Sequence, residues 1–132
     1  MACVLVVDDE PDIGDVIRRV LERAGFETTV THSAAAALAA IEVRTPDVII
    51  TDIIMPKTNG VDLIKKVRAE HPRVRVIAIS GGGSFGPLTY KPDAISTHAF
   101  LAAARDAGAD DVLTKPFDLG ELLAAIRRQL PN

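Results

Sequence analysis

The sequence predicts an α/β fold with a doubly wound, five-stranded parallel sheet and helices on both of its faces. Apolar strand patterns and amphipathic helix patterns alternate five times along the 132 residues. Several strands are nearly continuous runs of Val, Ile and Leu, as is typical of strands covered by helices on both faces. Because 48% of the residues are hydrophobic, a chain of this length can form a complete core, and we expect one domain over residues 1–132.

The first half of the chain predicts three strands and two helices. The strands are the apolar or β-branched runs at residues 3–8, 28–31 and 47–52. Pro11 suits the first turn of a helix whose apolar side chains recur at helical spacing, and Gly25 is a typical residue for its end. Ser33 can cap the Ala-rich helix at 34–43 that follows.

The second half predicts two more strands and three helices. The strands cover residues 74–80 and 112–114, and the helices carry their apolar side chains over residues 61–67, 96–107 and 119–130. Thr58 or Asn59 can cap the first of these helices, and Gly108 is the expected end of the second. Asp118 caps the third, where Glu121 is placed for a capping box.

Composition argues against several classes of protein. The net charge is −3 and no basic stripe is present, so we expect no direct contact with nucleic acid. The single cysteine, Cys3, excludes an internal disulfide and fits a reducing cytosol. No signal-peptide pattern or membrane-length apolar run is present, so we expect a cytoplasmic protein without membrane contact. The three histidines, His32, His71 and His98, lack ligand spacing and are interpreted as surface residues.

Polar residues end four of the predicted strands. They are Asp8 with Asp9, Asp52, Ser80, and Thr114 with Lys115. The carboxyl ends of parallel strands meet at one edge of the sheet, where ligands bind. Three carboxylates at such an edge repel one another unless a cation neutralises them, and a hard cation such as Mg²⁺ suits them. With a lysine and a hydroxyl nearby, one carboxylate can act as a nucleophile towards a phosphoryl group.

The ordered set of motifs resembles that of two-component response-regulator receiver domains of the chemotaxis-regulator type. It consists of Asp8-Asp9, Asp52 with Met55-Pro56 and Gly60, Ser80-Gly81, and Thr114-Lys115-Pro116-Phe117. The resemblance runs from about Cys3 to Leu130. It implies a flavodoxin-like fold with strand order 2-1-3-4-5, and a histidine kinase or histidine phosphotransfer protein as the phosphoryl donor.

The resemblance also implies a role for each residue of the edge. Asp52 is the expected phosphoacceptor, Ser80 the switching hydroxyl and Lys115 the partner of the phosphoryl group. Asp9 is the expected direct Mg²⁺ ligand, and Asp8 binds mainly through metal-bound waters. The implied metal ligands are therefore Asp8, Asp9, Asp52 and the backbone carbonyl of Ile54.

Two features depart from the family pattern, and the residue at position 54 bears on the lifetime of the phosphoryl group. Val112 stands where an aromatic residue often rotates inward, so an aromatic-rotamer switch is not expected. Residues 81–95 form a long loop, interpreted either as a flap in which Phe85 or Tyr90 partly replaces that ring or as an inert insertion. The apolar side chain of Ile54 cannot orient water, so we expect slower autodephosphorylation than with asparagine there.

The leading interpretation is a phosphorylation-activated switch in a two-component phosphorelay. It catalyses only its own phosphotransfer and autodephosphorylation, and is not otherwise an enzyme. We expect a monomer or weak dimer without an output domain, whose downstream effector the sequence does not identify. The alternatives are a phosphate-independent protein-binding receiver module, a Mg²⁺-dependent aspartyl phosphatase and a small flavin carrier. Ile54 disfavours the phosphatase, because a second acid belongs there, and the three carboxylates disfavour a phosphate-bearing flavin.

Overall fold

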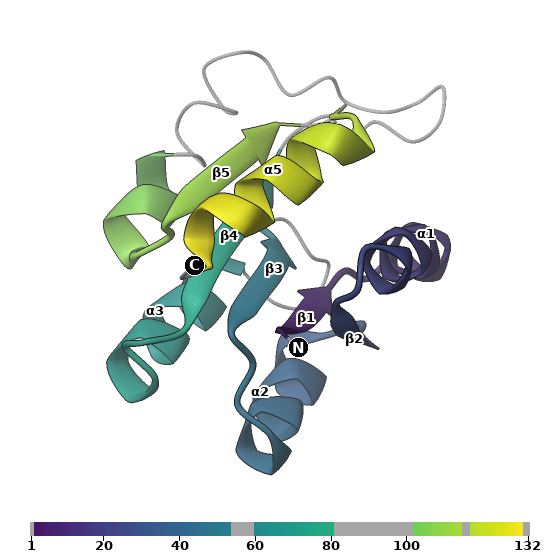
Figure 1. Cartoon of the computed structure of the whole chain (residues 1–132). Coiled ribbons are helices and arrows are strands. Elements are labelled where there is room, and N and C mark those ends of the chain that lie inside the picture. Colours follow the sequence, from purple (N-terminus) through teal and green to yellow (C-terminus); the bar gives the residue numbers. More distant parts are fainter. Residues whose placement is uncertain (1, 54–59, 81–101, 115–116, 131–132) are drawn as a thin grey trace, which may run out of the picture.

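The computed structural model describes residues 2–53, 60–80, 102–114 and 117–130 (Figure 1). The strands are β1 Cys3–Val7, β2 Glu27–Thr31, β3 Val48–Asp52, β4 Arg75–Ser80 and β5 Asp111–Thr114. The helices are α1 Pro11–Arg23, α2 Ala34–Val43, α3 Gly60–Glu70 and α5 Leu119–Gln129, and residues 102–107 are also helical. All five strands are parallel, in the order β2-β1-β3-β4-β5, which confirms the predicted fold class and strand order.

Helices cover both faces of the sheet, and each face has its own apolar cluster (Figure 1). Helices α1 and α5 pack on one face through Ile17, Leu21, Leu122 and Ile126. Helices α2 and α3 and residues 102–107 pack on the other, through Ala37, Ile41, Leu63, Ile64 and Ala104. The sheet is therefore the middle of three layers, and its strands β1 and β3 are buried along their whole length.

Strand β1 shows why the central strands read as continuous apolar runs. Val4 and Val6 belong to the cluster under α1 and α5, whereas Leu5 and Val7 belong to the cluster under α2 and α3. Successive side chains of a strand point to opposite faces, so a strand buried on both sides needs an apolar residue at each position. Polar residues can then appear only where the strand ends.

The helix boundaries follow the predicted capping residues. The Ser33 hydroxyl accepts a hydrogen bond from Ala36 N at 3.1 Å, and the Asp118 carboxylate accepts one from Glu121 N at 2.7 Å. Gly25 ends α1 with a φ of 96°, which is favourable only for glycine. The expected caps Thr58 and Asn59, residues 81–95 and the start of the helix expected at 96–107 lie outside the described residues.

Cys3 lies in the core at the start of β1. Burial raises the pKa of its thiol, as expected for a structural cysteine. Among the helices of the described residues, none is both long and apolar enough to cross a membrane.

Candidate acidic site at the carboxyl edge of the sheet

The strand register brings the acidic ends of β1 and β3 together. Val7 of β1 pairs with Thr51 of β3. Asp8 follows Val7 directly, and Asp52 follows Thr51. Asp52 in turn pairs with Ile79 of β4. This register aligns the ends of the two strands, so Asp8 and Asp52 lie next to each other at the edge of the sheet.

Three carboxylates gather at this edge, as the sequence predicts. Oxygens of Asp8, Asp9 and Asp52 all lie within 4.8 Å of one another. Asp8 is only 2% exposed and Asp52 7%, whereas Asp9 is half-buried. The cluster thus has two acids in the protein interior and one at the surface. It can bind a metal, because burial makes mutual repulsion of carboxylates costly and a cation removes that cost.

The geometry of the cluster fits a small divalent cation. Oxygens on opposite sides of one Mg²⁺ lie about 4.2 Å apart, and those of a larger Ca²⁺ about 5 Å apart. The three carboxylates lie within 4.8 Å of one another, which is the range that ligands of one such ion occupy. Small side-chain rotations therefore suffice to bring carboxylate oxygens to a common ion.

The first turn after β1 is held by backbone and side-chain hydrogen bonds around Asp8. Asp8 N donates to Thr31 O at 3.0 Å, and the Asp8 Oδ1 atom accepts from Glu10 N at 2.9 Å. His32 Nδ1 lies 2.9 Å from the Asp8 carbonyl oxygen, so this nitrogen carries hydrogen and donates. His32 is exposed, as the sequence predicts, and this bond links the loop after β2 to the acidic edge.

Glycine at position 60 allows α3 to begin directly against the end of β3. Gly60 N donates to Ile53 O at 2.8 Å, and Ile53 N donates to Ile79 O at 2.9 Å. A Cβ atom on Gly60 would overlap the Asp52 carbonyl oxygen and lie 2.7 Å from the Ile53 Cα atom. Any side chain here must therefore displace the backbone that carries Asp52.

Thr51 contributes to the same strand end, and sequence reasoning did not identify it. The residue is fully buried, and its hydroxyl donates to the Asp52 carbonyl oxygen at 3.0 Å. The only signal in the sequence is a single hydroxyl in the apolar run before Asp52. Such a residue also occurs in strands for its β-branched shape alone, so the pattern does not distinguish the two roles.

The remaining predicted site residues are only partly within the described part of the chain. The backbone of Ser80 ends β4 opposite Thr114 of β5, so both strands end at the acidic edge. The side chain of Ser80, and all of Ile54 and Lys115, lie outside the described residues. Val112 packs against the cluster under α2 and α3 as an ordinary aliphatic residue.

Comparison with known proteins gives one consistent family. Residues 4–127 match the response regulator receiver domain. The chain is 34% identical to the probable transcriptional regulatory protein TcrX of Mycobacterium tuberculosis, over 96% of this chain and 49% of that protein. It is 35% identical to the DNA-binding transcriptional regulator NtrC of Escherichia coli, over 98% of this chain and 25% of that protein. The chain thus spans about half or less of the length of these curated relatives.

Two solved structures show the same likeness over nearly all of their length. The receiver domain of NtrX from Brucella abortus superposes with a TM-score of 0.82 at 32% identity, covering 96% of this chain and 97% of that one. The chemotaxis response regulator CheY4 of Vibrio cholerae gives a TM-score of 0.81 at 28% identity, covering 98% and 99%.

Proposed function

Because the chain belongs to the response regulator receiver domain family, we propose that Asp52 accepts a phosphoryl group in a Mg²⁺-dependent reaction. Receiver domains of this family partner with histidine kinases. The donor proposed here is the phosphohistidine of a kinase or of a histidine phosphotransfer protein. The single observation that carries the proposal is the gathering of Asp8, Asp9 and Asp52 at the carboxyl edge of the sheet.

The position of Asp52 supports its role as the acceptor. It ends β3, between β1 and β4, and the Thr51 hydroxyl and the start of α3 fix its backbone. One of its carboxylate oxygens attacks phosphorus, the phosphorus–nitrogen bond of the donor breaks, and the imidazole leaves. Asp8 and Asp9 would hold Mg²⁺ at the same edge, where the ion would offset the charge of the phosphoryl oxygens.

Residues beyond the described acids complete the proposal. The Ile54 carbonyl serves as a further metal ligand, the Lys115 ammonium pairs with the phosphoryl oxygens, and the Ser80 hydroxyl donates to them. The match to the family over residues 4–127 supports these roles, since all three positions lie within the matched range. We assign residues 1–132 to a single receiver domain, which signals by a shift between two conformations.

Acetyl phosphate tests the acceptor without a kinase. We expect the wild-type protein to gain one phosphoryl group in the presence of Mg²⁺, as measured by intact-protein mass, and none in EDTA. Asp52→Asn should abolish the gain. Asp62→Asn, the same change at an exposed acid on α3, should leave it unaltered. An unmodified, folded wild-type protein would favour the phosphate-independent binding module, and a phosphorylated Asp52→Asn variant would place the acceptor elsewhere.

A further inference from the structure

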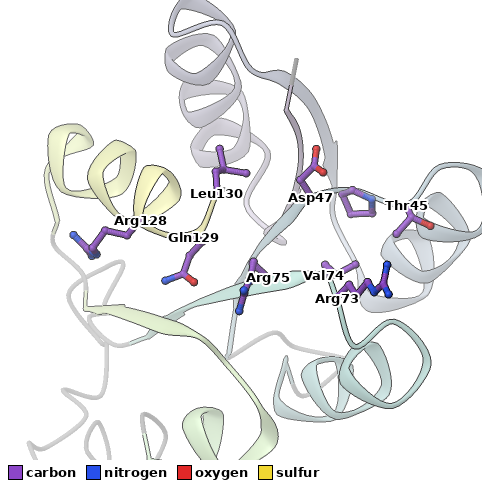
Figure 2. A pocket seen from close by; sticks show the side chains of 9 residues that line it. Thr45, Asp47, Arg73, Val74, Arg75, Arg128, Gln129 and Leu130 are labelled. Atoms are coloured by element: carbon purple, nitrogen blue, oxygen red, sulfur yellow. The ribbon is translucent and has the colours of Figure 1, made fainter. Parts of the chain in front are cut away.

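A cavity lies at the edge of the sheet opposite the acidic cluster, where the strands begin. Its volume is about 490 Å³, and it opens between the starts of β3 and β4 and the end of α5 (Figure 2). Arg73 and Arg75 line one side, and Gln129 and Leu130 at the end of α5 line the other. Small-molecule sites commonly have volumes of roughly 300–1,000 Å³, so the cavity is large enough for a metabolite.

The walls of this cavity offer mainly hydrogen-bond donors. Arg73 and Arg75 bring guanidinium groups, Gln129 brings an amide and Thr45 a hydroxyl. The one carboxylate of the lining, Asp47, is partly engaged, because its Oδ2 atom accepts from Cys3 N at 2.8 Å. A ligand of this cavity must therefore be rich in acceptors.

The arginines of the cavity retain positive charge that their neighbours do not neutralise. Asp110 is shared: its Oδ2 atom lies 2.7 Å from Arg68 NH2, and its Oδ1 atom lies 3.4 Å from Arg75 NH1. Among the described residues, Arg73 makes no ion pair or side-chain hydrogen bond. Only Arg128, at the rim, has a close carboxylate of its own, at 2.7 Å on Asp111.

We propose that this cavity binds a small organic diphosphate. Arg73 and Arg75 flank the buried Val74 in the sequence, and both line the cavity (Figure 2). Guanidinium groups match phosphate oxygens in geometry and charge, and two of them suit two linked phosphates better than one. Val74, Leu130 and the buried Pro46 provide an apolar wall for the organic part. The site is independent of phosphorylation, because the acidic cluster lies at the other end of the strands.

Inorganic pyrophosphate in EDTA is the probe, since without a metal the acidic edge repels it. Calorimetric titration of the wild-type protein should show saturable binding, and orthophosphate should bind more weakly. The double variant Arg73→Ala/Arg75→Ala should lose affinity by about tenfold or more, because two charge-assisted contacts are removed. The matched control is Arg18→Ala/Arg19→Ala on α1, where both arginines already pair with Asp15. It removes the same charge and should change affinity by less than about twofold.

Two further variants keep the test decisive if the arginine variant unfolds. Gln129→Glu places a carboxylate in the cavity without changing its shape and should also weaken pyrophosphate binding. Asp52→Asn should leave binding unchanged. Absence of saturable binding to the wild-type protein overturns the proposal, as does equal loss in the two double-arginine variants, which would mean general charge attraction. A change of affinity in Asp52→Asn, in either direction, also overturns it, because the anion would then occupy the acidic edge.

Discussion

Replacing Asp52 by asparagine removes one negative charge from three that lie within 4.8 Å of one another. Two carboxylates at that separation repel each other by about 3.5 kcal/mol at the effective dielectric constant of about 20 that suits protein sites. Asp52 takes part in two such pairs, which gives about 7 kcal/mol before solvent screening is considered. Solvent screening at the half-buried Asp9 reduces this value, and we expect Asp52→Asn to stabilise the metal-free protein by roughly 1–3 kcal/mol.

Thermal unfolding in EDTA measures this stabilisation. For a domain of this size, 1 kcal/mol corresponds to about 4 °C in Tm, so the variant should melt roughly 4–12 °C above the wild-type protein. Mg²⁺ should then raise the Tm of the wild-type protein more than that of the variant, because less repulsion remains to be neutralised. Asp62→Asn, an exposed acid on α3, is the control and should shift Tm little. A lower Tm for Asp52→Asn in EDTA, or an equal Mg²⁺ effect on both proteins, would refute the reasoning.

Three more changes test the packing of the fold and the chemistry of the site. Gly60→Ala should destabilise the fold by about 1–3 kcal/mol in urea unfolding, because the new Cβ overlaps the Asp52 carbonyl oxygen; an exposed helical glycine would instead gain stability from this change. Arg68→Met should destabilise the fold by about 2 kcal/mol in the same assay, since Arg68 NH2 donates at 2.7 Å to both Gly108 O and Asp110 Oδ2. A loss below about 0.5 kcal/mol would show that these hydrogen bonds do not stabilise the fold. Ile54→Asn should speed loss of the phosphoryl group in a mass-based decay assay, because the amide can orient water, and an unchanged rate would contradict this.

The fold followed from local rules that the sequence displays directly. Strand β1 is recognisable because burial on both faces demands an apolar residue at each position from Val4 to Val7. Ser33 and Asp118 were predictable as caps because each accepts a hydrogen bond from the backbone N–H three residues later, and such a short-range bond can be read from the sequence. The acidic cluster was predictable because parallel strands align their carboxyl ends at one edge.

The features missed are contacts between residues far apart in the chain. His32 reaches the carbonyl of Asp8, 24 positions earlier, and nothing in the spacing of the histidines marks this bond. The basic cavity is similar, since Arg73 and Gln129 come from segments that meet only when α5 packs on the sheet. Such contacts depend on packing angles between elements, which periodicity does not encode.

The central claim, that Asp52 carries the phosphoryl group, can be tested most directly by trapping the modified residue. Borohydride reduces an aspartyl phosphate to homoserine, and peptide mass spectrometry then identifies the position. After treatment with acetyl phosphate and Mg²⁺, we expect homoserine at position 52 and unmodified aspartate at positions 8 and 9. Homoserine at position 8 or 9, or at none of the three in a protein that has gained phosphoryl mass, would contradict the assignment.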